Sequence, residues 1–178
     1  MFSLKMFPHL HYHYDKLTEF KLPNDIKKYM SDKGLPILDN ANWGDIEAIV
    51  FYEESMLSFY DKNNKFIIIG ILYDLHYICL NIDDGGVYMI NNGIHSDSLT
   101  SIELPELANS SLSLFIEFIS IYYYYVNKYR VKFENYEEEI AIFVSNELEK
   151  EFRARDEAIM DDENSFWSVR VEEIAYMI

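Results

Sequence analysis

Three short apolar runs separated by polar breaks lie along residues 65–92, and this pattern predicts three short β-strands in succession. Each of the three runs is rich in Ile, Val and Tyr and has the length of a strand. The breaks between the runs fall at residues 73–74 and 83–86, and the two glycines of the second break suit the positive φ angles of a tight hairpin. We therefore expect a three-stranded antiparallel meander around which the rest of the chain is organised.

The middle run of the meander has two faces of different character. Ile78, Leu80 and Ile82 alternate on one face, and Tyr77, Cys79 and Asn81 alternate on the other. Because one set is aliphatic and the other is semi-polar, we expect the first face to pack against helices and the second face to be more open.

Apolar residues at helical spacing predict helices before and after the meander. The first helix opens at Pro23 and ends at Gly34, because proline and Asp25 suit a first turn and glycine suits the position after the last turn. A second helix follows the polar residues 109–111, whose side-chain oxygens can accept hydrogen bonds from its first N–H groups. Its expected buried stripe is Leu112, Phe115, Phe118 or Ile119, Tyr122, Tyr125 or Val126, and Tyr129.

Two more helices are expected towards the C-terminus, one beginning at Tyr136 and one spanning residues 163–177. Their expected buried stripes are Tyr136, Ile140, Phe143, Leu148 and Phe152 in the first, and Trp167, Val171, Ile174 and Ile178 in the second. A strand is expected at residues 46–54 and a short edge strand near residues 101–103. We interpret residues 1–20 as an N-terminal arm or edge strand.

Length and composition predict one folded domain over residues 1–178. Apolar residues make up 49% of the chain, which excludes a disordered protein. The chain has 15 basic and 31 acidic residues, a formal net charge of −16, and residues 131–178 contain 14 of the acidic and 5 of the basic ones. Such a charge repels nucleic acid and anionic membranes, and it favours a basic partner.

The single cysteine, Cys79, excludes an internal disulfide and is consistent with a reducing cytoplasm. Residues 1–20 lack the apolar core that a signal peptide requires. The most apolar run, residues 111–126, is short for a membrane span and contains Glu117, so we expect a buried helix there. The six glycines form no phosphate-binding pattern, and we expect no cofactor.

Three histidines near the N-terminus, His9, His11 and His13, would share one face if their segment were a strand. Alternate imidazoles can bind a transition metal, and an HxH pair near the N-terminus also occurs in metal-dependent hydrolases built on (β/α)₈ barrels. Those barrels need about 250 residues, and neither an HExxH nor a CxxC motif follows here. We therefore interpret the histidines as part of a solvated or half-buried strand, with a metal site as the alternative.

Two acidic clusters are candidates for contact with a partner. The first is Glu137, Glu138 and Glu139, and the second is Asp161, Asp162 and Glu163. The first cluster suits the first turn of a helix, where successive side chains diverge, so a solvated face is favoured over paired catalytic carboxylates. The second lies in an expected turn and lacks the DxDxDG order of a calcium loop. The tyrosines at 122–125 also diverge, so we expect them to pack in the protein and not to stack on bases.

Five short motifs follow one another in a distinctive order. They are Leu22-Pro23 with Lys33-Gly34-Leu35-Pro36, Phe66-Ile67-Ile68-Ile69-Gly70, Ile78-Cys79-Leu80-Asn81 with Gly86-Val87-Tyr88-Met89-Ile90, Asn109-Ser110-Ser111-Leu112 with Phe115, and Asp156 with Phe166-Trp167. Their order and spacing resemble the SUKH superfamily, named for its fungal cell-wall regulator and herpesvirus relatives. The last two motifs resemble its fourth clade, and together the five cover about residues 20–175.

The resemblance implies an α+β fold in which a twisted antiparallel sheet is flanked by helices. It also implies a protein that binds and is not an enzyme, because many bacterial members are immunity proteins that bind a toxin domain encoded beside them, often a nuclease or a nucleic-acid deaminase. Others are regulatory adaptors. We therefore expect an immunity protein that occludes the active site of a basic toxin domain, with a non-enzymatic adaptor for a cellular protein as the alternative. The acidic charge agrees independently, since a nuclease that binds phosphates must be basic.

The surface that would contact the toxin is expected to include both acidic clusters and the more open sheet face, represented by Tyr77 and Asn81. No nucleic acid or membrane is expected as a partner. The oligomeric state stays open at this point.

Overall fold

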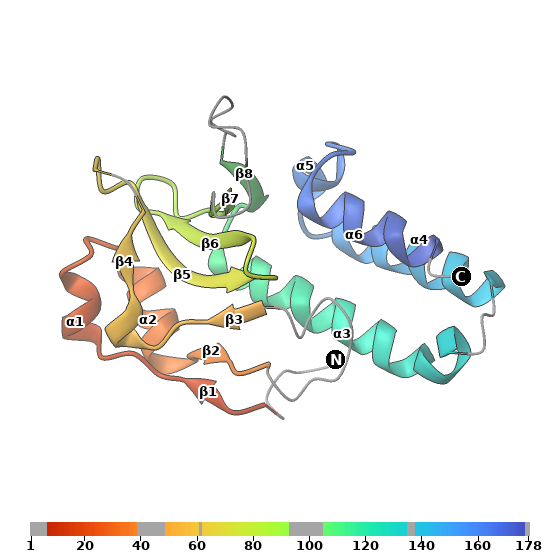
Figure 1. Ribbon diagram of the computed structural model, residues 1–178, viewed down its shortest axis with the longest axis horizontal. Helices are drawn as coiled ribbons and strands as arrows, with labels where there is room; N and C mark the ends of the chain where they lie inside the picture. The colour runs from red at the N-terminus through yellow and green to blue at the C-terminus, as the bar shows by residue number, and fades with distance from the viewer. Residues whose placement is uncertain (1–6, 39–48, 61, 93–104, 135–137, 177–178) are drawn as a thin grey trace.

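The structure is a computed structural model that describes residues 7–38, 49–60, 62–92, 105–134 and 138–176 (Figure 1). It combines an antiparallel sheet with helices that lie behind the sheet and beyond its β8 edge. The α+β class implied by the sequence is therefore confirmed.

Among the described residues the main sheet has six strands, and its centre is the predicted meander. The meander strands are β5 (Phe66–Leu72), β6 (His76–Asn81) and β7 (Val87–Asn91), which pair antiparallel in sequence order. Strand β3 (Ile49–Phe51) and the short β4 (Ser58–Phe59) both pair with β5, and β8 (Glu106–Asn109) pairs with β7. A separate two-stranded sheet joins β1 (His9–Leu10) to β2 (Leu35–Pro36).

Both hairpins of the meander form at the predicted breaks. In the first turn, residues 73–74 take φ angles of 53° and 57°, the positive values that a tight two-residue hairpin uses. In the second turn Gly85 has a φ angle of 75°, and the side-chain oxygen of Asn81 accepts a hydrogen bond of 2.8 Å from the backbone N–H of Asp83. Asn81 therefore has a structural role in closing this hairpin.

The helices of the described ranges form two groups. They are α1 (Tyr14–Thr18), α2 (Asn24–Asp32), α3 (Leu112–Glu134), α4 (Glu138–Arg153), α5 (Glu157–Met160) and α6 (Phe166–Ala175), with a short 3₁₀ turn at Glu54–Met56. Figure 1 shows α1, α2 and the start of α3 next to the sheet, whereas α4, α5 and α6 lie together beyond its β8 edge. Helix α3 runs from the sheet towards this second group.

Two helix boundaries follow the predicted signals. Helix α2 ends before Gly34, whose φ angle is 74° and whose N–H donates to the carbonyl of Tyr29 at 3.2 Å. A Cβ atom on Gly34 would lie 2.5 Å from the carbonyl oxygen of Leu10, so β1 can approach only a glycine. Helix α3 begins after Ser111, whose hydroxyl accepts a hydrogen bond from the backbone N–H of Leu114 at 3.3 Å.

The main core lies between the sheet and the helices. The sheet contributes fully buried aliphatic side chains from one face, and α2 and α3 contribute apolar side chains that pack against them. The principal members are Ile67, Ile69, Ile78, Leu80, Ile26, Met30, Leu112, Phe115, Phe118, Ile119 and Tyr122. The predictions for the aliphatic face of the meander and for the stripe of α3 are therefore confirmed.

Trp167 is the centre of the packing between α3, α4 and α6. Its side chain is 2% exposed and is surrounded by five aromatic rings. The rings belong to Phe115, Phe118, Tyr122, Phe152 and Phe166, with centroids 4.8–6.3 Å from that of Trp167. This arrangement joins three helices through one side chain.

A buried polar network ties the end of β8 to the C-terminal helices. The indole N–H of Trp167 donates to the side-chain oxygen of Asn109 at 2.6 Å. One carboxylate oxygen of Asp156 accepts hydrogen bonds from the backbone N–H and the hydroxyl of Ser110, at 3.2 and 3.1 Å, and from the amide of Asn109 at 3.5 Å. Because Asn109 and Asp156 are buried, these bonds replace water on both groups.

Several boundaries differ from the sequence predictions. The stripe of α4 consists of Ala141, Val144, Leu148 and Phe152, whereas Phe143 is 44% exposed, so its assignment to the core was wrong. Phe143 instead meets the ring of Tyr129 at 5.7 Å. The last helix starts at Phe166 and not at Glu163, because the hydroxyl of Ser165 caps it by accepting a hydrogen bond from the N–H of Ser168.

Other predictions fall partly outside the described residues. The strand expected at residues 46–54 is observed as β3, and positions 46–48 lie outside the described ranges. The edge strand expected at residues 101–103, Tyr136 and Ile178 also lie outside them. The described strand at this edge is β8. At the N-terminus the expected strand is limited to β1, and His13 already precedes α1.

Candidate partner-binding surface

The face of the sheet that points away from the main core is apolar across its width. The strand register aligns two rows of side chains on it. The first row is Val50, Ile71, Tyr77 and Ile90, and the second is Ile68, Cys79, Tyr88 and Leu107. We call these residues, together with Tyr52, Tyr60 and Phe66, the outer sheet face.

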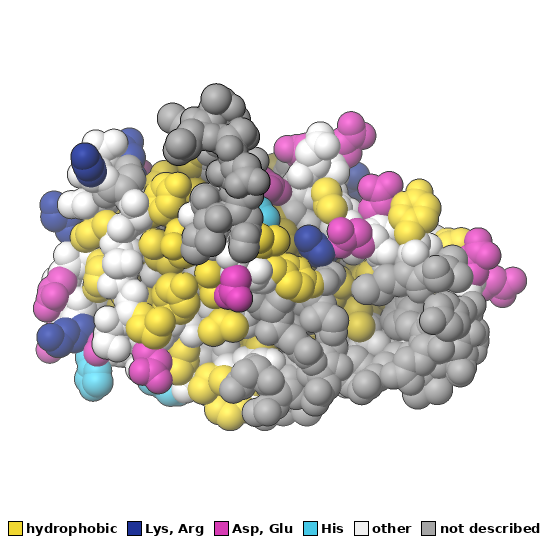
Figure 2. Space-filling model, in the orientation of Figure 1, with side chains coloured by type: hydrophobic (Ala, Val, Ile, Leu, Met, Phe, Trp, Pro, Cys, Tyr) yellow, Lys and Arg dark blue, Asp and Glu magenta, His cyan; other side chains and the backbone are white. Residues whose placement is uncertain are grey.

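Aromatic rings account for much of the outer sheet face. Tyr60 and Tyr77 meet edge to face with centroids 6.1 Å apart, and Phe66 and Tyr88 do the same at 5.3 Å. Tyr52, Phe66, Tyr77 and Tyr88 pack around a small second cluster of Ile68, Cys79 and Ile90. Figure 2 shows hydrophobic side chains, in yellow, gathered over the strands on this side of the molecule. Such half-buried rings offer a partner large contact areas at low cost in side-chain entropy.

Carboxylates border this face at the hairpin turns. The hydroxyl of Tyr88 donates to Asp84 at 2.9 Å, and burial together with this bond raises the pKa of Tyr88 to about 12. Burial also raises the pKa of Tyr52, and the nearby charge of Asp74 adds to the effect. Both hydroxyls therefore stay neutral at physiological pH and present polar groups on an apolar surface next to negative charge.

Cys79 lies beneath these rings and is fully buried. Burial raises the pKa of its thiol from 9.0 to about 12, so the reactive thiolate is absent from the folded protein near neutral pH. This position makes Cys79 a poor nucleophile.

We predict that Cys79 does not react with a thiol reagent such as Ellman's reagent at pH 8 in the native protein, and reacts fully in 8 M urea. The physical reason is that both access and ionisation require opening of the sheet. Rapid stoichiometric labelling without denaturant would contradict the placement of Cys79 under the outer sheet face.

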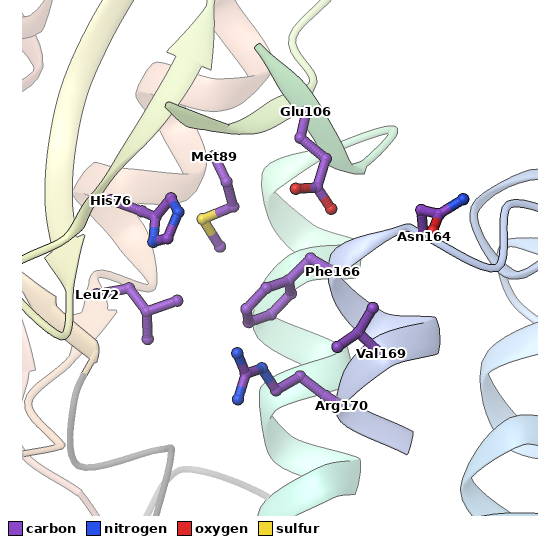
Figure 3. Close-up of a pocket in the computed structure, with 8 residues that line it drawn as sticks. All are labelled: Leu72, His76, Met89, Glu106, Asn164, Phe166, Val169 and Arg170. Carbon is purple, nitrogen blue, oxygen red and sulfur yellow. The ribbon is translucent and has the colours of Figure 1, made fainter. Parts of the chain in front are cut away.

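A small pocket of about 110 Å³ lies where the sheet meets α6 (Figure 3). It is lined by Leu72, His76, Met89, Glu106, Asn164, Phe166, Val169 and Arg170. Burial raises the pKa of Glu106. A hydrogen bond from the backbone N–H of Phe166 and the positive charge of Arg170 act in the opposite direction and limit this rise. Arg170 also pairs with Glu173 at 2.6 Å and lies over the ring of Phe166. The volume is well below the roughly 300 Å³ at which small-molecule sites begin, so the pocket fits at most one side chain of a partner.

The structure separates the two acidic clusters proposed from the sequence. Glu138 and Glu139 are exposed in the first turn of α4, and Glu137 lies outside the described residues. Asp161 contacts Arg153 in the last turn of α4, at 2.6 Å, so the second cluster lies at the opposite end of this helix. A helix of 16 residues is about 24 Å long. The clusters therefore do not form one continuous patch.

The members of the second cluster differ in their surroundings, although all three are exposed. Asp161 is paired with Arg153, and the carboxylate of Asp162 accepts a hydrogen bond from the backbone N–H of Asn164 at 3.0 Å. These two carboxylates thus support the turn between α5 and α6. Tyr77 lies on the outer sheet face, and Asn81 is on the same strand but serves the hairpin, as described above.

The three N-terminal histidines have separate surroundings. The rings of His9 and His11 lie 6.4 Å apart, and each Nδ1 atom is within hydrogen-bond distance of a backbone carbonyl. His13 instead meets the carboxylate of Glu54 at 3.1 Å. Within the part of the chain that the structure describes, no group of three His, Cys, Asp or Glu side chains is arranged to hold a metal ion.

From the sequence, only Tyr77, Cys79 and Asn81 were predicted to lie on this side of the sheet. The other members of the outer sheet face belong to strands whose register the sequence does not reveal. The available signal was the cluster of aromatic residues on both sides of residues 66–77, namely Tyr52, Tyr60, Phe66 and Tyr88. None of the helices within the described ranges is long and apolar enough to cross a membrane.

An apolar, ring-rich sheet face bordered by carboxylates is typical of a protein that binds another protein. The chain belongs to the SUKH-4 immunity protein family, whose model matches residues 13–173. No significant match was found among curated proteins or among solved structures. The family resemblance inferred from the order of the motifs is therefore confirmed.

Proposed function

We propose that this immunity protein binds and neutralises one cognate toxin domain, a basic nuclease or nucleic-acid deaminase, and does so in the cytoplasm of the cell that makes both. The observation that carries the proposal is the family match over residues 13–173. The net charge of −16 supports the basic character of the partner, because an enzyme that binds phosphates presents the complementary positive surface.

The mechanism that we propose is occlusion of the toxin's active site by a preformed surface. Trp167 and the buried polar network hold the helices against the sheet, so the surface is organised before the partner arrives. Acidic side chains such as Glu138 and Glu139 would act at longer range by steering a basic domain towards the protein. No bond-making step is required of the immunity protein.

The proposal is tested by mixing the purified protein with a catalytically inactivated toxin domain encoded beside its gene. We expect a stable complex whose association rate falls steeply between about 50 and 500 mM salt, because the Debye length shortens over this range. Absence of a complex at both salt concentrations would refute the proposed function. A complex whose formation is independent of salt would refute the electrostatic part alone.

A further inference from the structure

We propose that the outer sheet face is the surface on which the toxin domain docks, and that the acidic clusters on the C-terminal helices lie outside the contact. This inference rests on the proposed function and adds the location of the interface. Of the contact residues expected from the sequence, it keeps the sheet face around Tyr77, omits the two acidic clusters, and extends the surface over β3, β5, β6, β7 and β8.

The composition of the outer sheet face supports this location. Five aromatic rings lie on it, and the exposed aliphatic side chains of Val50 and Leu107 extend it to both edges of the sheet. Binding energy in protein interfaces is concentrated in tyrosine and other large side chains at the centre of a contact. The described members of the C-terminal acidic clusters are exposed carboxylates, which contribute more to association rate than to affinity.

The described helices leave the outer sheet face uncovered. Every side chain assigned to the cluster around Cys79 comes from β5, β6 or β7 or directly follows β3. Helices α2 and α3 pack against the opposite face, where the main core lies (Figure 1). A sheet face with this many rings is therefore presented outward by the described part of the chain.

The charge around the outer sheet face favours a basic domain as its partner. The described residues from 49 to 92 contain five carboxylates and two lysines, and Asp84 accepts a hydrogen bond of 2.9 Å from the hydroxyl of Tyr88 on the face itself. A basic domain meets these carboxylates favourably. A second copy of this chain would bring like charges together around the same rings, which costs energy in an interface.

Two matched pairs of variants test the location. Val50 and Ile142 are aliphatic and similarly exposed, at 48% and 44%, on the outer sheet face and on α4 respectively. Lysine is tolerated on an edge strand such as β3 and in a helix such as α4. Tyr60 and Tyr14 are both 41% exposed, and only Tyr60 lies on the proposed surface. The four variants are Val50→Lys, Ile142→Lys, Tyr60→Ala and Tyr14→Ala.

We expect Val50→Lys and Tyr60→Ala each to weaken binding of the inactivated neighbouring toxin domain by about tenfold or more. Ile142→Lys and Tyr14→Ala are expected to change the Kd by less than about twofold, as exposed positions outside an interface do. Titration calorimetry measures all four, and thermal unfolding of each free variant shows that the fold is kept.

The possible outcomes distinguish failure of the proposed interface location from failure of the proposed function. If the unchanged protein forms no complex, the proposed function fails and the location fails with it. If the unchanged protein binds the toxin domain and Val50→Lys and Tyr60→Ala bind it equally well, the proposed function stands and the proposed location of the interface is overturned. Loss of affinity in Ile142→Lys would overturn the location most clearly. If the free protein is a dimer that Val50→Lys dissociates, a second copy occupies the face and the location is likewise overturned.

Discussion

Replacing Trp167 with alanine is expected to lower the free energy of unfolding by about 3–5 kcal/mol, the usual cost of removing a buried aromatic side chain. The side chain is fully enclosed by rings from α3, α4 and α6, so the cavity cannot collapse without moving three helices. In addition, the side-chain oxygen of Asn109 loses the hydrogen bond of 2.6 Å that it accepts from the indole N–H of Trp167. Urea unfolding followed by circular dichroism measures the change.

The control for this prediction is Trp167→Phe, which keeps an aromatic ring in the site and removes the N–H group. We expect a loss between zero and that of the alanine variant, because part of the ring packing remains while Asn109 is left without its donor. If Trp167→Ala unfolds within about 1 kcal/mol of the unchanged protein, the side chain is not the packing centre that the structure indicates.

Replacing Asp156 with alanine is expected to destabilise the protein by about 2–4 kcal/mol. One carboxylate oxygen of Asp156 accepts three hydrogen bonds from Ser110 and Asn109. Because Asn109 is fully buried, its side-chain amide cannot form a replacement hydrogen bond with water in the variant. The result would be loss of the link between the end of β8 and the C-terminal helices. Thermal and urea unfolding of the variant measure the effect.

Asp161→Ala is the matched control, because Asp161 is a nearby aspartate that is exposed and paired with Arg153. Exposed ion pairs contribute about 0–1 kcal/mol, so this variant should be close to the unchanged protein. Equal destabilisation by the two substitutions would contradict a special role for the buried network. The conservative variant Asp156→Asn, which retains one side-chain oxygen, should fall between them.

The parts of the fold that were predicted from the sequence are those with strong local signals. The meander follows from alternation and from the turn residues at 73–74 and 83–86, and the ends of α2 and α3 follow from Gly34 and Ser111. The stripe of α4 was predicted in part, because Phe143 and Val144 are both apolar and helical spacing alone allows either to point inward. The three-dimensional packing against α3 and α6 selects Val144.

The sequence does not predict the buried polar network, although its residues belong to the last two of the five motifs. Asp156 is buried and accepts hydrogen bonds from residues 46 and 47 positions away in the sequence. Contacts of this range depend on how whole elements pack, which local patterns do not contain. The same holds for the outer sheet face, since its rows exist only once β3, β5, β6, β7 and β8 are aligned in register.

Net charge can be counted from the sequence, and it favours the acidic residues as candidates for contact with a partner. The structure distributes them over both ends of α4 and around the hairpins, so charge alone does not locate a contact surface. The apolar outer sheet face and the carboxylates beside it combine the two features that a tight complex with a basic protein needs.

The most direct test of the account is survival of cells that produce the active toxin domain encoded beside this gene, with and without the present chain. Cells are expected to die without the chain and to grow normally with it, and the protecting chain is expected to be recovered bound to the toxin domain. Cells that die equally in both cases, or that survive while the toxin domain stays unbound and fully active, would contradict protection by direct binding.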